Sequence, residues 1–205
     1  GKTVLVIDSQ DKPSASLVAG GLFNPVTGRK MVLTWMAADL FPKLQAYYSE
    51  LESLLKVDFL INRTLYRPFL SIEEQNEWHG KWSESRFKPF VNRVVSDVYH
   101  NLPVNNPFGG LELKQSGAIR TKILLEAFRN YLESKSSYLN EEFDHSKLNQ
   151  YDDHIVYKQY RALKVIFAEG PNIKNNPWFK SVKINGLKGE VLDIKTEKPI
   201  DKIVS

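Results

Sequence analysis

The sequence has no cysteine among its 205 residues, which excludes disulfide bonds, thiolate metal sites and a cysteine nucleophile. It also has no apolar run of about 18 residues, the length that a membrane-spanning helix needs, and no stretch that resembles a signal peptide. These absences favour a cytoplasmic protein without a membrane partner. The four histidines lie in unrelated contexts without a second ligand at metal spacing, so we expect no metal site; they are His79, His100, His145 and His154.

The chain has no large excess of charge of one sign. Its 28 basic and 24 acidic residues give a net charge of +4, and the basic residues are spread along the sequence. This distribution indicates a solvated surface and makes nucleic acid an unlikely partner. The hydrophobic content of 42% is enough for a core, and the aromatic content is 12%. We expect most aromatic side chains, including Trp35 and Tyr47, to pack in that core.

A stretch rich in small residues, 15–29, follows a short apolar strand at 3–7 that ends in Asp8. The strand is apolar enough to be a buried parallel strand. Small residues let the backbone approach a large planar ligand closely. A buried strand followed by an acid is also typical of the second half of a dinucleotide-binding unit, where the carboxylate accepts hydrogen bonds from a ribose. Asp8 is either this ligand or an ordinary turn residue, and the glycines downstream favour ribose contact.

Four stretches, in this order, carry a family resemblance: 4–8 with 14–29, then 116–119 before a helix, 165–170 and 187–192. Together they extend over most of the chain. They resemble the flavin-dependent amine oxidoreductases related to D-amino acid oxidase and glycine oxidase. The resemblance implies FAD as cofactor and a small-molecule amine or amino acid as substrate, with hydride transfer from the substrate to the flavin.

The resemblance also implies positions for the cofactor and the substrate. Asp8 would bind the ribose, the main chain near Phe143 would lie close to the adenine, and Gly170 would form a small-residue turn beside the cofactor. The loop residues expected at the flavin are Ala15, Ser16, Gly20, Gly21 and Leu22. Arg67 is the candidate for binding a substrate carboxylate. No residue is predicted to be catalytic, because the flavin itself carries the chemistry.

One departure from the family is that the chain has no Gly-x-Gly-x-x-Gly loop. In such sites this loop and the following helix bind the diphosphate. The sequence therefore predicts an internal fragment of a longer flavoprotein, in which the loop lies about 20 residues before Asp8. We expect the fragment alone to bind FAD weakly or not at all and to self-associate. The alternative is a non-catalytic interaction or regulatory module that retains part of the fold.

The predicted fold class is α/β with mixed α+β character. It comprises a partial Rossmann-like FAD-binding domain, 1–56 and 114–182, and an inserted antiparallel-sheet substrate domain, 57–113 and 183–205. A helix is predicted to end near Lys56, with Pro42 either in its first turn or kinking a longer helix from Val32. Its expected apolar stripe is Leu40, Leu44, Tyr47, Leu51 and Leu54.

Other elements are predicted from local patterns. Residues 57–61 and 65–70 indicate a hairpin, and Ser71 with Glu74 forms a capping box for the next helix. Residues 91–98 are compatible with a strand or a helix. Thr121 is expected to cap a helix whose inward stripe is Leu124, Ala127, Phe128 and Tyr131. Strands are expected at 108–113, 138–143, 154–160, 163–168 and 188–194.

Overall fold

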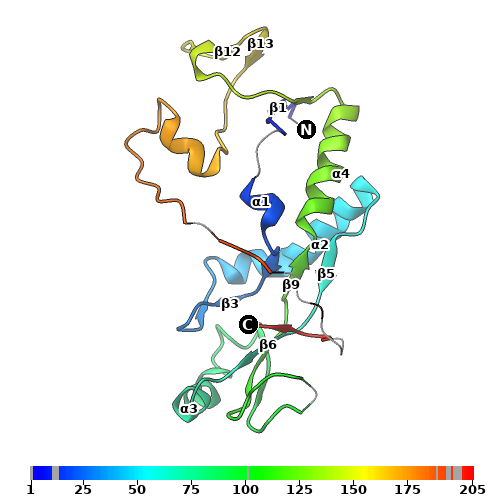
Figure 1. Ribbon diagram of the computed structural model, residues 1–205, viewed down its shortest axis with the longest axis vertical. Coiled ribbons are helices and arrows are strands. Elements are labelled where there is room, and N and C mark those ends of the chain that lie inside the picture. Colours follow the sequence, from blue (N-terminus) through cyan, green and yellow to red (C-terminus); the bar gives the residue numbers. More distant parts are fainter. Residues whose placement is uncertain (1, 11–13, 101, 188, 193–194, 196–199) are drawn as a thin grey trace. The chain divides into compact units, whose positions relative to one another are not determined.

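The computed structural model describes residues 2–10, 14–100, 102–187, 189–192, 195 and 200–205. The chain is a mixed α/β protein with several small sheets (Figure 1). It divides into two compact units. The smaller unit comprises Gly1–Pro13 and Leu132–Glu190, and the larger unit comprises Ser14–Tyr131 and Val191–Ser205. The predicted cofactor domain draws residues from both units, and its boundaries stay a prediction.

The larger unit is built around a four-stranded sheet in the order β14-β6-β8-β7. The strands β6, β7 and β8 pair in antiparallel fashion, and β14 pairs with β6 in parallel. A second sheet has the order β2-β9-β5, and β3 and β4 form a separate pair. The strands are β2 (Leu22–Phe23), β3 (Val26–Thr27), β4 (Val32–Leu33), β5 (Leu60–Asn62), β6 (Leu65–Pro68), β7 (Val91–Val95), β8 (Gly110–Leu113), β9 (Gly117–Ile119) and β14 (Ile203–Val204).

The core of the larger unit lies on one face of the four-stranded sheet. Because strand side chains alternate between faces, Leu111 and Leu113 point to this core while Glu112 points to the other face. The core cluster consists of Val26, Met31, Leu65, Phe69, Trp78, Phe87, Val91, Leu111 and Leu113. Of the two alternatives for 91–98, the strand is correct for the part that forms β7, Val91–Val95. The strand predicted at 108–113 is confirmed over the shorter range of β8, Gly110–Leu113.

The predicted hairpin at 57–70 is wrong, because β5 and β6 pair with different partners. Strand β5 pairs with β9, and β6 pairs with β8. Ser116 fixes the point where the chain passes from one sheet to the other. Its Oγ accepts a hydrogen bond from the Leu65 N–H at 3.0 Å and lies 2.9 Å from the Arg63 carbonyl and 3.2 Å from the Leu113 carbonyl. The long-range partners outweigh the local turn signal at 62–64.

The helices of the larger unit are α1 (Ala15–Val18), α2 (Ala37–Leu55), α3 (Ile72–Lys81) and α4 (Thr121–Ser134), the last of which continues into the smaller unit. Neither predicted start of the long helix is correct. Met36 precedes α2 in the left-handed region (φ 53°), and Pro42 lies inside the helix. At the other end, Lys56 is left-handed (φ 57°) and its N–H bonds the Glu52 carbonyl, so the helix ends where the sequence predicts.

The face that α2 buries differs from the predicted stripe. Ala37 and Phe41 are buried, and Phe41 packs edge-on against Phe90 at 6.0 Å. By contrast Tyr47 is 62% exposed and Trp35, just before the helix, is 79% exposed. The expectation that these two aromatic residues pack in the core is wrong. The helix carries two apolar stripes, and spacing alone does not tell which one is covered.

Helix α3 begins as its capping residues predict. Ser71 Oγ accepts the Glu74 N–H at 3.3 Å, and Glu74 Oε2 accepts the N–H of Leu70 at 2.7 Å. In α4, Thr121 is the first helical residue and its hydroxyl donates to the Ala19 carbonyl at 3.2 Å, so it does not act as the predicted cap. No residue of α4 is buried, although its predicted apolar stripe is present.

The smaller unit contains one parallel strand pair and one antiparallel three-stranded sheet. Strand β1 (Val6–Ile7) pairs in parallel with β10 (Tyr138–Leu139). The sheet has the order β11-β12-β13, formed by β11 (Leu148–Gln150), β12 (Ile155–Tyr157) and β13 (Tyr160–Ala162). Two 3₁₀ helices, η1 (His145–Lys147) and η2 (Gly170–Asn175), complete the unit. The parallel pairing of the first strand agrees with the prediction, but the predicted buried strand at 3–7 is wrong in length and burial. Strand β1 has two half-buried residues and Val4 is 56% exposed, because β10 is the one strand that pairs with β1 among the described residues. Strand β10 is in turn shorter than the predicted strand at 138–143.

Two further strand predictions in this unit are wrong. The segment 154–160 is a hairpin rather than one strand, because Lys158 adopts a left-handed conformation (φ 53°) and Tyr157 pairs with Tyr160. The apolar segment 163–168 forms no strand, and Phe167 stacks against Trp178 at 5.5 Å instead. Of the predicted strand at 188–194, the described residues 189–192 form no strand, and 188, 193 and 194 lie outside the described residues.

Candidate functional site

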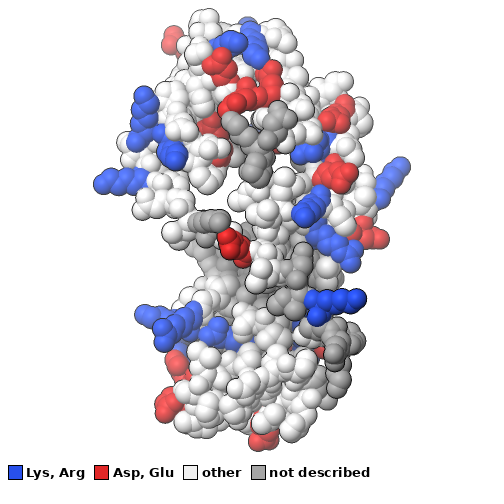
Figure 2. Space-filling model, viewed as in Figure 1, with Lys and Arg blue, Asp and Glu red and all other residues white. Residues whose placement is uncertain are grey.

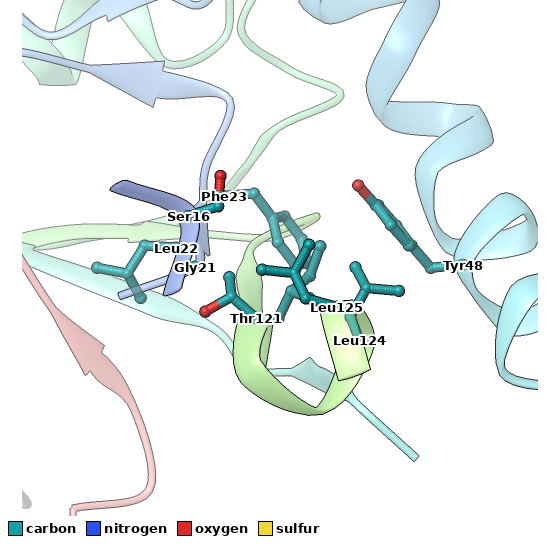
Figure 3. Close-up of a pocket in the computed structure, with 9 residues that line it drawn as sticks. Ser16, Gly21, Leu22, Phe23, Tyr48, Thr121, Leu124 and Leu125 are labelled. Carbon is teal, nitrogen blue, oxygen red and sulfur yellow. The ribbon is translucent and has the colours of Figure 1, made fainter. Parts of the chain in front are cut away.

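A pocket of about 380 Å³ in the larger unit includes part of the predicted flavin loop (Figure 3). Among the predicted residues, Ser16, Gly21 and Leu22 line it. Ala15 lies beside Ser16 in α1, and Gly20 is exposed directly before Gly21. The rest of the lining comes from β2, α2, β9 and the start of α4, namely Phe23, Tyr48, Ile119, Thr121, Leu124 and Leu125. The structure therefore brings together the loop and a second segment about 100 residues later in the sequence.

Gly21 is required by the fold of this site. Its φ is +67°, and a Cβ at this position would lie 2.0 Å from the carbonyl oxygen of Ile119. The Ile119 N–H also donates to the Gly21 carbonyl at 2.9 Å. A side chain would break this close approach of loop and strand. A ligand contact for Gly21 stays a prediction, whereas Gly20, with nothing within 4 Å of an added Cβ, has space beside it.

The pocket contains no ionisable acid or base apart from one tyrosine. Tyr48 projects from α2 toward Phe23 (Figure 3), and its ring packs edge-on against Phe59 at 6.1 Å. Burial, followed by the neighbouring Tyr47, raises the pKa of Tyr48. The other polar side chains of the lining are the hydroxyls of Ser16 and Thr121. Such a lining suits a neutral, largely apolar group that accepts or donates a few hydrogen bonds.

The other predicted cofactor residues lie in the smaller unit. Asp8 follows the carboxyl end of β1, and its backbone is fixed on β10 by the Asp8 N–H to Leu139 carbonyl bond at 3.1 Å and the Tyr138 hydroxyl to Asp8 carbonyl bond at 3.1 Å. The exposed Asp8 side chain has no partner among the described residues. Its carboxylate is therefore oriented by the backbone and available to a ligand.

Phe143 and Gly170 belong to the same unit but to different segments. The Phe143 ring stacks on Tyr157 with centroids 4.3 Å apart, and Tyr157 Oη accepts the N–H of Asp144 at 3.1 Å. These contacts fix the chain just after β10. Gly170 begins η2 with a φ of +55°, a conformation that favours glycine, and an added Cβ would meet nothing within 4 Å. A turn at Gly170 is thus confirmed, and its contact with a cofactor stays a prediction.

Arg67, the predicted substrate residue, lies in β6 and does not line the pocket. Its Nη2 lies 3.6 Å from Glu74 Oε1 and donates to the Arg29 carbonyl at 3.4 Å. Both side chains of the Arg67–Glu74 pair are about 15% exposed, and the buried Arg67 Nε has no hydrogen-bond partner within the part of the chain that the structure describes. Because Glu74 already balances its charge, a substrate carboxylate would have to compete with this internal ion pair.

A charged cluster around the buried Glu112 lies on the opposite face of the four-stranded sheet and was not predicted. A bulge in β7 lets two consecutive residues reach Glu112: Asn92 Nδ2 at 3.0 Å and Arg93 Nε at 2.9 Å. Lys202 Nζ adds a third contact at 3.3 Å. Burial works to raise the pKa of Glu112, but the hydrogen bonds from Arg93 and Asn92 and the charge of Lys202 outweigh it, so this pKa is lowered.

Sequence reasoning missed the partners of the loop. Tyr48 and Phe23 carried no signal beyond an aromatic residue in a helix or strand, and Leu124 was read only as helix packing. The sequence around Thr121 did offer a clue, because 116–119 resembles a family segment. Its register with the loop follows from the long-range pairing Leu22–Ala118 and Phe23–Gly117, which local patterns do not specify.

Each unit by itself offers one feature that an FAD site would use. In the smaller unit, the Asp8 carboxylate follows a parallel strand and has no partner among the described residues. In the larger unit, the uncharged pocket offers apolar surface. Binding of a diphosphate needs a glycine turn, and this sequence lacks the Gly-x-Gly-x-x-Gly loop. No group of three or more potential ligands among the described residues could hold a metal ion. Within the same residues, no helix is both long and apolar enough to cross a membrane.

No protein-family model matches the chain, and no solved structure matches it.

Proposed function

We propose that this chain is part of an FAD-dependent oxidoreductase that oxidises an amine or an amino acid. The supporting observation is the parallel pair of β1 and β10, whose strands lie about 130 residues apart in sequence and hold Asp8 at their carboxyl end. In open parallel sheets, ligands bind at the carboxyl ends of the strands. The pair is also the arrangement expected from a Rossmann-like cofactor domain into which a second sheet is inserted.

The residues divide the work of holding the cofactor. Asp8 would accept hydrogen bonds from the ribose hydroxyls, and the main chain beside Phe143, fixed by its stack on Tyr157, would contact the adenine. The flavin contacts of Ser16, Gly20 and Leu22, which lie in the larger unit, stay predictions from the resemblance. When bound, the flavin supplies the acceptor for the hydride that leaves the carbon bearing the amine, and the substrate becomes an imine.

A titration with FAD tests this proposal. The protein is expressed with its native flanking sequence, and FAD binding is measured for Asp8→Ala beside the control Asp152→Ala, a second exposed aspartate of the smaller unit. Asp8→Ala should weaken binding by roughly 1.5 to 3 kcal/mol, the usual range for hydrogen bonds to a charged group, while Asp152→Ala should not change it. Equal affinities would return Asp8 to the role of a turn residue.

The reaction is tested separately on the FAD-bound protein. A panel of amines and amino acids is mixed with it in the absence of oxygen, and loss of the oxidised flavin absorbance is followed. At least one primary or secondary amine should bleach the flavin, whereas the corresponding alcohols should not. A purified protein without FAD affinity would favour the non-catalytic module instead.

A further inference from the structure

The smaller unit contains a second pocket, of about 360 Å³, that the flavoprotein proposal does not use. Three aromatic side chains, Phe167, Trp178 and Phe179, form part of its wall. The remaining apolar lining is aliphatic and comes from β11, β12 and the segment after β13, namely Leu148, Ile155, Leu163 and Val165. A volume of this size is near the lower end for small-ligand sites, which suits a molecule of one or two rings.

Contacts with residues outside the lining order the aromatic wall. Trp178 and Phe167 stack with centroids 5.5 Å apart and an interplanar angle of 22°, and the His145 ring lies within 6.1 Å of both. Asn176 is fully buried. Its Oδ1 accepts a hydrogen bond from the backbone N–H of Trp178 at 3.0 Å, and its Nδ2 donates to Glu169 Oε2 at 2.8 Å. Such a wall is ordered before a ligand arrives, so less conformational entropy is lost on binding.

Two polar side chains complete the lining, and neither has a partner among the described residues. They are the amide of Gln150 and the ammonium of Lys164. Glu169 does not line the pocket. Its carboxylate already accepts hydrogen bonds from His145 at 2.7 Å and from Asn176. The pocket therefore combines apolar and aromatic surface with a single unbalanced positive charge.

We propose that this pocket binds a small aromatic carboxylate. The ring would pack against Trp178 and the aliphatic side chains opposite, where apolar area is removed from water. The carboxylate would lie at Lys164 and accept a hydrogen bond from Gln150. Its lining shares no residue with the loop pocket and does not include Asp8, so the proposal does not depend on the cofactor.

Binding of phenylacetate and of its neutral isostere phenylacetamide distinguishes this proposal from simple hydrophobic binding. Both probes are titrated by calorimetry, and Trp178 emission is isolated by subtracting the Trp178→Phe variant. Phenylacetate should bind about fivefold more tightly than the amide, which corresponds to about 1 kcal/mol, the upper range for an exposed ion pair. Its binding should change the Trp178 emission.

Lys164→Gln should remove most of this preference without unfolding the unit, because Lys164 is exposed. Lys174→Gln, an exposed lysine of η2 that does not line the pocket, is the matched control and should keep the preference. The proposal is overturned if neither probe binds at millimolar concentration, if acid and amide bind equally to the wild-type chain, or if Lys164→Gln and Lys174→Gln behave alike. Retained FAD affinity in Lys164→Gln would separate this site from the cofactor site.

Discussion

The two units reach their folds with very different amounts of buried apolar surface. The larger unit has a continuous core around Trp78, Leu111 and Leu113. In the smaller unit, Tyr157 and Asn176 are the buried side chains among the described residues. Its other contacts include the stack of Phe143 on Tyr157 and the partly exposed ion pair of Lys158 with Glu141. Burial of apolar area is the main favourable term in folding. We therefore expect the larger unit to be the more stable of the two, and the smaller unit to gain more from a bound ligand.

The charge distribution does not separate the units in the same way. On the face shown in Figure 2, basic and acidic side chains of the described residues are interspersed. This pattern agrees with the mild net charge of +4 and is typical of a solvated surface. The difference between the units therefore lies in their interiors, and substitutions of buried residues are the sharpest way to test it.

The largest expected effect is that of Trp78→Ala in the core of the larger unit. Trp78 is 2% exposed and packs edge-on against Phe87 at 4.9 Å. Removing it should lower the free energy of unfolding by about 3 to 5 kcal/mol, the usual range for a buried aromatic residue. Trp82→Ala, just after the same helix and 39% exposed, is the control and should cost less than half as much. Similar losses in both variants, measured by denaturant unfolding, would show that the core is not where we place it.

A smaller effect is expected for Asn176→Ala in the smaller unit. The substitution removes the hydrogen bonds to the Trp178 N–H and to Glu169, and it should cost about 1 to 3 kcal/mol. Because the two units have separate interiors, the loss should appear in the Trp178 emission and leave the unfolding of the larger unit unchanged. Asn175→Ala, at an exposed neighbouring position, is the control. A shift of both transitions together would mean that the units unfold as one.

Glu112→Gln tests the buried charged cluster of the larger unit. The lowered pKa of Glu112 means that its contribution to stability is present above its ordinary pKa of 4.5 and is lost as the pH falls through the folded-state pKa. The substitution should cost about 1 to 2 kcal/mol at neutral pH and reduce the loss of stability in acid. Unfolding measured across acidic pH checks this. An acid transition identical to that of the wild-type chain would show that other carboxylates dominate it.

The smallest effect at neutral pH is expected for Tyr66→Phe. The Tyr66 side chain is fully buried and its hydroxyl has no hydrogen-bond partner among the residues that the structure describes, so removing the hydroxyl should leave stability unchanged or slightly raised. Burial, followed by the neighbouring Tyr99, raises the pKa of Tyr66 from 10 to about 12. The stability that this raised pKa contributes to the folded state is therefore complete below pH 10 and is lost as the pH rises through about 12. The phenylalanine variant should lack this part of the alkaline loss, whereas a clear destabilisation at neutral pH would reveal an unrecognised hydrogen bond.

The comparison also shows which features a local sequence pattern specifies. The capping box at Ser71 and Glu74 depends on interactions within a few residues, and the strand at 110–113 carries a local apolar pattern; the structure contains both. The hairpin at 57–70 failed because each of its strands found a better partner about 50 residues away. The prediction that Trp35 packs in the core failed for a related reason. Composition indicates which residues can be buried, but it does not indicate which of them the fold covers.

The candidate site shows the same division. Asp8 was predicted because an acid after an apolar strand is a local signal. The structure places it at the end of a parallel strand, and its contact with a ligand stays a prediction. Tyr48 and Thr121 were missed as site residues because their place beside the loop depends on the β2–β9 register. Glu112 was missed because its partners come from a bulge and from Lys202, 90 residues later in the chain.

Amide hydrogen exchange of the protein with and without FAD tests the central claim most directly. If Asp8 binds the ribose, FAD should slow exchange at the ends of β1 and β10, because a ligand that binds only the native state lowers the population of open forms. Exchange in β6, β7 and β8, which lie in the preformed core, should not change. Protection confined to the four-stranded sheet, with none at β1 and β10, would contradict the account.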